Sequence, residues 1–295
     1  MIRSRRAVLG GLAAGIAVSP LRAISISPTA WGNFGIEIEA ARLTQGGWLK
    51  GRLTAPELFT ALRLGAVDVL PDAAGRFFVG FDRDAPDIAY LTGSCRTAGA
   101  CTLKHDPPQF GLAITPRQWQ IERVNAAFHP PAMPDADFAR IRKDELAQIG
   151  AARAQNSDSL GWKQSFAWPL TGPLRGRFGS QRIFRGTPAA YHPGLDIAGA
   201  QGAPYVAPAD GLVTLAAATP FTLEGNLLVV DHGMGLSSAF LHSSRLAVKV
   251  GDRVQQGQLL GWVGKTGRAT GPHLHWALKW REARLDPLLF VALVH

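Results

Sequence analysis

The chain has 295 residues, of which 46% are hydrophobic and 18% are charged. This balance excludes an intrinsically disordered protein, and the length is enough for two ordinary domains with a sizeable core. The 33 glycines and 20 prolines favour strands joined by tight turns. The formal net charge of +9 comes without a concentrated Lys/Arg run, so it does not indicate a nucleic-acid-binding protein.

The first 23 residues have the pattern of an export signal. The arginine pair in Ser4–Leu9 precedes an apolar run from Ala7 to Val18, which is typical of a twin-arginine signal peptide. We expect cleavage near Ala23; the alternative, a retained anchor, is disfavoured because the run is short. Residues 1–23 hold four arginines and no acids, so cleavage lowers the net charge from +9 to +5. The remaining basic bias favours contact with an anionic surface such as a cell wall or a membrane face.

The predicted location is the bacterial periplasm, with no stable membrane insertion after cleavage. No later stretch of the sequence is long enough for a transmembrane helix. The two cysteines, Cys95 and Cys101, lie close together in a glycine-containing segment. In an oxidising compartment we expect them to form a local disulfide. A reactive thiol pair is the weaker alternative, because the spacing is not Cys-x-x-Cys.

Residues 24–133 are predicted to form a β-rich N-terminal domain. Several runs in this region alternate apolar and polar residues or are rich in strand formers, and turn residues separate them. A short helix is predicted over Pro56–Leu64, opening at Thr54 or Ala55. The segments with the strand pattern include Gly35–Glu39, Arg76–Phe81 and Gln118–Glu122.

Residues 134–160 are predicted to form a helix and a linker. The proline-rich segment Pro130–Pro134 marks a boundary. A helix is predicted from Asp135 to about Gln155, followed by a linker over Asn156–Gly161. The predicted apolar face of this helix consists of Phe138, Ile141, Leu146 and Ile149.

Residues 161–295 are predicted to form a compact module of antiparallel β-sheet. Short strand-like runs follow one another closely, and Asp210–Gly211 and Glu224–Asn226 are turn signals between them. The predicted fold class is therefore mainly β, with a β-rich N-terminal domain and a linking helix ahead of this C-terminal module.

His273 and His275 are the first candidate functional pair. Residues i and i+2 of a strand point to the same face, so both imidazoles can face one groove while Leu274 packs behind them. The Gly271-Pro272 dipeptide ahead of them provides a tight entry to the strand. Alone, the pair could equally be two ordinary strand histidines.

His192 and Asp196 are the second candidate pair. Pro193 and Gly194 between them disfavour a helix, so a turn leading into a strand is predicted to bring both side chains to one metal ion. A zinc site that hydrolyses a peptide needs three ligands from His, Asp or Glu and a fourth position for water. The two pairs together make such a site more plausible than either pair alone.

The other histidines are weighed individually. His242 follows an apolar strand-like run and is predicted to project toward the same groove, although a lone histidine there is more often structural. His232 lies in an Asp-His-Gly setting that is typical of a turn, so it is predicted to be structural. His105 and His129 are isolated, and the terminal His295 is uninformative.

From about residue 165 to 290 the chain resembles the lysostaphin-type, or LytM-type, zinc endopeptidases, which cut peptides in bacterial cell walls. The order and spacing of several segments make this a specific resemblance, whereas residues 24–160 are less distinctive. The matching segments are Gly176–Gly179, His192–Ala198, Ala207–Gly211, Val230–Gly235, Val250–Val254, Gly257 and Gly264–Trp276.

The resemblance implies a role for each candidate residue. His242 and His273 match the two catalytic histidines that flank the metal-bound water, and one zinc ion per chain is implied. Phe240 stands where relatives often carry Tyr, and we expect this departure to affect packing more than catalysis. The residues that match the zinc ligands are His192, Asp196 and His275.

The resemblance and the export signal together predict a periplasmic zinc endopeptidase acting on peptidoglycan stem peptides or cross-links. We expect a monomer whose partner is peptidoglycan, with a regulatory envelope protein as a further candidate partner. The alternatives are a non-hydrolytic envelope regulator that activates a cell-wall amidase, and a zinc protease of ordinary proteins. Residues 24–133 either cover the groove or serve as a substrate-positioning or folding module.

Overall fold

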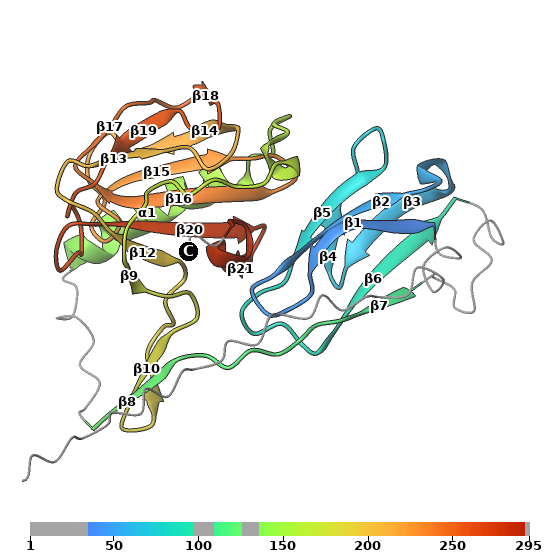
Figure 1. Ribbon diagram of the computed structural model, residues 1–295, viewed down its shortest axis with the longest axis horizontal. Helices are drawn as coiled ribbons and strands as arrows, with labels where there is room; N and C mark the ends of the chain where they lie inside the picture. Colours follow the sequence, from blue (N-terminus) through green and yellow to red (C-terminus); the bar gives the residue numbers. More distant parts are fainter. Residues whose placement is uncertain (1–34, 97–108, 126–135, 293–295) are drawn as a thin grey trace, which may run out of the picture.

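The computed structural model describes residues 35–96, 109–125 and 136–292, and the regular structure in these ranges is mainly β-strand (Figure 1). The predicted fold class is confirmed, because a β-rich N-terminal region and a helix precede an antiparallel sheet module. Within the described ranges, no helix is long and apolar enough to cross a membrane. The predicted signal segment 1–23 and Cys101 of the predicted disulfide lie outside the described residues.

The N-terminal region contains two antiparallel sheets. One has the strand order β1-β2-β5 and the other the order β4-β3-β6-β7. Their inner faces bury large side chains such as Leu49, Phe77 and Leu91, each fully shielded from solvent. The strands are β1 (Ile36–Arg42), β2 (Trp48–Leu53), β3 (Phe59–Leu64), β4 (Val67–Val69), β5 (Arg76–Gly80), β6 (Ile88–Cys95) and β7 (Gln109–Ala113).

The helix predicted over Pro56–Leu64 is wrong for most of its length. Only a single 3-10 turn forms, η3 (Pro56–Leu58), and the chain then continues as strand β3. Proline suits the first position of a helix, which explains the turn. Beyond it, Phe59 and Leu62 are buried while β3 pairs with β4 and β6 on its two sides. Pairing with β6, about thirty residues further along the chain, therefore overrides the local helical signal.

The C-terminal module is built on one antiparallel sheet with the strand order β18-β14-β15-β16-β20-β12-β9, and β21 pairs with β20 (Figure 1). A small sheet, β13-β19-β17, lies beside it. The strands of the main sheet are β9 (Leu174–Gly176), β12 (Leu195–Ala198), β14 (Gly211–Ala216), β15 (Asn226–Asp231), β16 (Leu236–Ser243), β18 (Arg253–Val254), β20 (His273–Trp280) and β21 (Ala283–Leu285). The small sheet consists of β13 (Pro204–Val206), β17 (Arg245–Leu246) and β19 (Leu259–Trp262), and the short 3-10 turns are η4 (Gly161–Lys163) and η5 (Pro287–Leu289).

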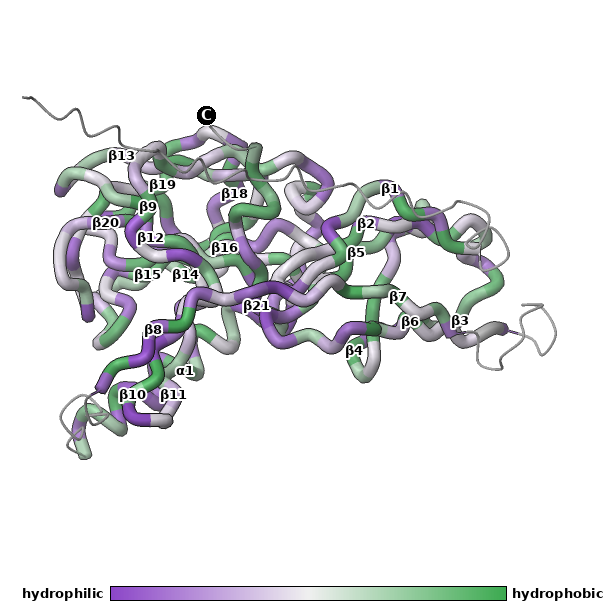
Figure 2. Tube along the Cα trace, turned by 60° about the horizontal axis from the view of Figure 1, so that its bottom comes forward, coloured by the Kyte–Doolittle hydropathy of each residue, from purple (hydrophilic) through white to green (hydrophobic). Residues whose placement is uncertain are grey.

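An arm formed by two separate segments of the chain, residues 121–124 and 181–188, projects from the module in Figure 1. β8 (Ile121–Val124) pairs in parallel with β10 (Gln181–Phe184), which also pairs with β11 (Thr187–Pro188). Hydrophilic and hydrophobic residues are mixed along this arm in Figure 2. A strand from the predicted N-terminal region thus joins a sheet made of residues from the C-terminal region.

Helix α1 (Ala136–Ala154) forms where a helix is predicted, but it buries only part of the predicted apolar face, with Ile149 as the buried member. Ile149 and Ala152 pack against the sheet through Leu227 and neighbouring apolar residues of β14, β15 and β16. Two residues of the predicted apolar face, Ile141 and Leu146, are 40% and 53% exposed. A polar residue, Glu145, is buried instead, because it bonds to the loop before β15.

The N-terminal region packs against the last strands of the module. The indole of Trp48 donates a hydrogen bond to the Leu289 carbonyl at 3.0 Å, and its ring lies 5.5 Å from that of Phe290. Arg117 pairs with the buried Asp286 at 2.8 Å. Among the described residues, no hydrogen bond or ion pair between the two regions involves any of the five candidate site residues.

We predict that Trp48→Ala lowers the free energy of unfolding of the full chain by about 3 kcal/mol, because a large buried side chain leaves a cavity. Chemical denaturation followed by circular dichroism measures this loss. Leu70→Ala is the matched control, since Leu70 is 58% exposed and its removal is expected to change little. Equal losses for the two variants would show that Trp48 does not hold the regions together.

Candidate metal centre

The pairing of β12 with β20 brings the two predicted fragments together. Asp196 lies directly opposite His275 in this antiparallel pair, and Ala198 lies opposite His273. His273 and His275 share one face of β20, while Leu274 points the other way and is fully buried. His192 precedes β12 in a non-helical segment, as the Pro193-Gly194 dipeptide predicts.

Three of the five predicted side chains form a compact ligand cluster. The Asp196 Oδ1 atom is 3.1 Å from His192 Nε2 and 2.8 Å from His275 Nδ1, and the two histidine nitrogens are 3.2 Å apart. Among the described residues, this is the group whose ligand atoms could hold a metal ion. Tetrahedral zinc with bonds of about 2.0–2.1 Å requires ligand separations of about 3.3 Å, so the donor set fits zinc.

A backbone carbonyl orients the first histidine ligand. The Nδ1 atom of His192 lies 3.2 Å from the Arg177 carbonyl oxygen, to which it donates when protonated there. That hydrogen bond leaves Nε2 as the atom facing Asp196 and His275. Metal-binding histidines in proteins are commonly oriented in this way by a second partner.

His242 and His273 lie next to the ligand cluster. Their ring centroids are 5.0 Å apart, and the His242 ring is 6.3 Å from that of His275. His242 Nδ1 donates to the Thr266 carbonyl at 2.8 Å, and His273 Nδ1 donates to the Gly271 carbonyl at 2.8 Å. Because both Nδ1 atoms carry the proton, each neutral ring keeps an unprotonated Nε2 that can accept another.

The backbone of His242 explains why its side chain reaches this face. In a regular strand, His242 would share the face of Phe240, which is buried against Tyr205 on the opposite side of the sheet. Its φ of 65° lies in the left-handed region, which is uncommon for a residue other than glycine. This local break in alternation turns the imidazole toward His273, and strained backbone of this kind gathers at functional sites.

The charges of the cluster suit metal binding. Burial opposes ionisation of Asp196, but hydrogen bonds from His192 and His275 outweigh it and hold its pKa well below the usual range. Burial lowers the pKa of His275 and also that of His242, so both rings favour the neutral form. For His192, burial is outweighed by the hydrogen bond and charge of Asp196, which raise its pKa.

His232 is structural, as its sequence context predicts. It is fully buried, and burial lowers its pKa to about 4, so it stays neutral. Its Nδ1 donates to the Asp210 carbonyl, and its Nε2 accepts from the Ser238 hydroxyl, both at 2.8 Å. Both ring nitrogens are therefore satisfied inside the core. His105, His129 and His295 lie outside the described residues.

Two glycines contribute to the site in a way that the sequence argument missed. A Cβ atom on Gly176 would lie 2.5 Å from Asp196 Oδ2 and 3.0 Å from His192 Cε1. A Cβ atom on Gly194 would lie 2.9 Å from His275 Nε2. Both positions therefore leave room for the ligand side chains. The sequence shows that both glycines lie in the matching segments. Their steric role is visible only in the structure, where β9, β12 and β20 pair side by side.

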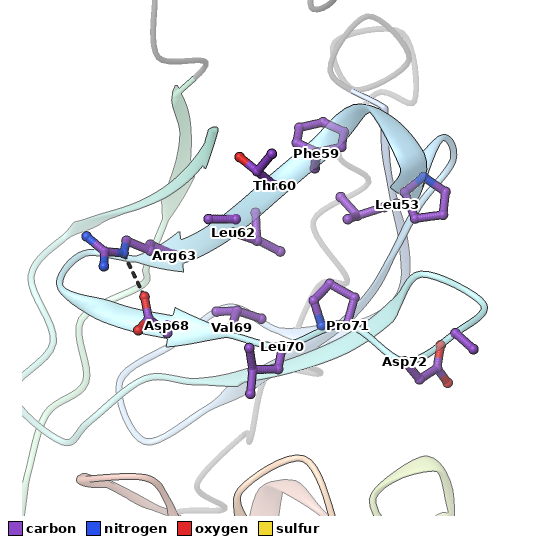
Figure 3. Close-up of a pocket in the computed structure, with 13 residues that line it drawn as sticks. Leu53, Phe59, Thr60, Leu62, Arg63, Asp68, Val69, Leu70, Pro71 and Asp72 are labelled. Atoms are coloured by element: carbon purple, nitrogen blue, oxygen red, sulfur yellow. Dashed lines mark hydrogen bonds and ion pairs between the residues drawn. The ribbon is translucent and has the colours of Figure 1, made fainter. Parts of the chain in front are cut away.

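A cavity of about 640 Å³ lies in the N-terminal region (Figure 3). It lies between the β3–β4 hairpin and the chain around Pro71, and apolar side chains such as Phe59 and Leu70 line it. Its ion pair, Arg63 with Asp68 at 2.7 Å, is mostly exposed. The described lining contains no histidine or cysteine, so it offers no ligand set comparable to the cluster on β12 and β20.

Comparisons with known proteins agree with this geometry. Residues 190–287 match the profile of Peptidase family M23. Peptidoglycan DD-endopeptidase ShyA of Vibrio cholerae is 36% identical over 137 residues, which is 45% of this chain and 31% of ShyA. Cell division protein DipM of Caulobacter vibrioides is 38% identical over 141 residues, which is 48% of this chain and 22% of DipM. The chain thus spans less than a third of the length of these two curated relatives.

One solved structure resembles nearly the whole chain. A crystal structure described as a peptidase M23 from Pseudomonas aeruginosa has a TM-score of 0.60 and 27% sequence identity. The match covers 85% of this chain and 95% of that one. Residues 190–287 thus match a peptidase family M23 domain, in agreement with the resemblance of the motifs.

We predict that Gly176→Ala weakens zinc binding by roughly tenfold or more, because the added methyl group displaces Asp196 and His192 from the ligand cluster. Competition with a zinc-chelating dye measures the change. Gly150→Ala is the matched control, because a Cβ at Gly150 meets no atom within 4 Å. If Gly176→Ala binds zinc as tightly as this control, the close approach of Gly176 to Asp196 and His192 does not affect zinc binding.

We predict that zinc affinity falls as the pH drops through the pKa of His192, which lies above 6.5. Protons compete with zinc for the ligating nitrogen, so the affinity should fall by about tenfold per pH unit below that pKa. Asp196 adds nothing to this slope, because its lowered pKa keeps it ionised throughout the range. Calorimetric titration at several pH values tests this, and an affinity that stays flat under acidification would contradict it.

Proposed function

We propose that this protein is a zinc-dependent endopeptidase that hydrolyses peptide bonds in peptidoglycan stem peptides or cross-links. The observation that carries the proposal is the cluster of His192, Asp196 and His275 with His242 and His273 beside it. The family M23 domain supports a peptidase, and the name of the relative ShyA supports a peptidoglycan substrate.

His192, Asp196 and His275 would hold the zinc ion, one per chain, through Nε2, a carboxylate oxygen and Nδ1 respectively. Zinc bound there would act as a Lewis acid toward a peptide carbonyl and a water molecule. The ionised Asp196 offsets part of the metal charge, and the neutral form of His275 leaves its nitrogen available as a ligand.

His242 and His273 handle protons in this proposal. The Nε2 atom of one accepts the proton of the attacking water, since both rings already donate from Nδ1 to backbone carbonyls. The other, when protonated, donates a hydrogen bond to the carbonyl oxygen as negative charge develops on it. The accepted proton then passes to the leaving amine. Separate pH–rate profiles of the two alanine variants assign the two roles.

The proposal also covers the peptide bond that is cleaved, the cellular location and the oligomeric state. We infer cleavage of a D-alanyl–diaminopimelate bond, and the DD-endopeptidase names of similar proteins support this inference. We also propose export through the segment 1–23 to the periplasm, and action as a monomer. The division into 24–133, 134–160 and 161–295 is likewise a proposal, and a regulatory envelope protein is a candidate partner.

We predict that the full chain loaded with zinc cuts the peptide cross-links of purified sacculi, so that later digestion of the glycan with a muramidase yields monomers in place of dimers. His242→Ala should lower the rate of cross-link cleavage by at least about a hundredfold. Mass spectrometry of the released muropeptides measures the loss of cross-linked dimers and identifies the bond. The variant should retain zinc, since His242 is not in the ligand cluster.

Lys249→Ala, at an exposed position, is the control that should cleave normally. Wild-type protein that binds zinc and leaves the dimers intact would contradict the proposal. If that same protein stimulated an amidase, the non-hydrolytic regulator would be supported instead. Cleavage of casein but not of sacculi would indicate a protease of ordinary proteins.

A further inference from the structure

A groove of about 220 Å³ begins at the candidate metal centre and is lined by α1 and β20, together with Pro193 and Arg284. His275 is part of this lining, so the groove is continuous with the ligand cluster. Ala277 and Lys279 follow His275 on the same face of β20, which gives the groove its direction along the strand. We call it the α1–β20 groove.

The far end of the α1–β20 groove is basic. Lys279 lies directly opposite Arg284 in the pairing of β20 with β21, and Arg153 of the last turn of α1 also lines the groove. Lys279 is four residues beyond His275, which corresponds to about 13 Å along a strand. A peptide extending from the metal centre along β20 would therefore reach these cations within about four residues.

The cations of the groove differ in whether they already have acidic partners. Arg142 is held by Glu224 at 2.6 and 2.7 Å, at the end of the groove near His242. Lys279 pairs with Glu282 at 2.6 Å. Within the described part of the chain, Arg153 and Arg284 form no ion pair with a carboxylate, and Arg284 lies over the ring of Tyr191 instead.

Arg153 is the more unusual of these two residues. Its Nε atom is buried and has no hydrogen-bond acceptor among the described residues. Burial, followed by the nearby charge of Arg284, lowers the pKa of its guanidinium. A buried donor of a charged group without an acceptor is costly, and a carboxylate is the acceptor whose geometry matches a guanidinium best. The charges of Glu282 and Glu224 offset part of this effect, but neither carboxylate forms an ion pair with Arg153. The guanidinium of Arg153 can therefore still take a carboxylate from outside the chain.

We propose that the α1–β20 groove binds a carboxylate-bearing segment of the substrate peptide, with Arg153 and Arg284 as the residues that select the carboxylate. This inference rests on the proposed function, because it names the part of the substrate that lies beyond the cleaved bond. It makes the enzyme selective for acidic peptides over neutral ones of the same sequence.

The test uses two stem peptides of identical sequence, one with free carboxylates and one with every carboxylate amidated. Calorimetric titration of the full chain gives the Kd of each. The wild-type protein should bind the acidic peptide about tenfold more tightly, the difference expected for one charge-assisted hydrogen bond. This preference should disappear in Arg153→Gln and shrink in Arg284→Gln.

Arg140→Gln is the matched control, since Arg140 lies on the same helix, is 68% exposed and does not line the groove. It should keep the full preference. The alternative role for Arg153 is to stabilise the last turn of α1 by its charge. In that case Arg153→Gln would lower the Tm but leave the ratio of the Kd values for the two peptides unchanged. That result would overturn the inference, as would equal binding of the two peptides or no binding of either.

Hydrolysis of sacculi by the same proteins separates this inference from the proposed function. If the wild-type chain prefers the acidic peptide but cleaves no cross-link, the proposed function fails and the carboxylate site stands. If it cleaves cross-links but binds both peptides equally, the proposed function stands and the carboxylate site fails.

Discussion

The antiparallel pairing of β12 with β20 is the constraint on which the candidate site depends. It sets Asp196 opposite His275 and places His273 two residues away on the same face. Because side chains alternate along a strand, a slip of one residue would move these groups to opposite faces. The fully buried Leu195, Leu274 and Trp276 hold this register from the other face, so core packing and ligand geometry are fixed together.

The second layer of the site is the loop that supports His242. The backbone N–H of His242 donates to the Glu224 carbonyl at 2.9 Å, and the Glu224 carboxylate is held by Arg142 of α1. Glu145, one turn further along α1, accepts hydrogen bonds from the backbone and hydroxyl of Thr222. Helix α1 therefore does more than link the two regions, since its polar face is tied to the loop behind a candidate catalytic residue.

Much of this arrangement could be predicted from the sequence, because strand periodicity and motif spacing are local signals. The same-face placement of His273 and His275 is an example. What could not be predicted depends on distant partners. Pro56 begins a turn that resembles a helix start, and only the pairing with β6 reveals a strand. The exposure of Leu146 follows from polar contacts of α1, and the left-handed backbone of His242 has no signature in its neighbours.

The most direct test of this account is a crystal structure of the zinc-loaded protein with anomalous diffraction measured at the zinc edge. We expect one zinc ion per chain, bound by His192, Asp196 and His275, with His242 and His273 beside it and not coordinated. A zinc ion bound through His242 or His273 in place of one of these ligands, or bound elsewhere in the chain, would contradict the assignment on which the proposed function rests.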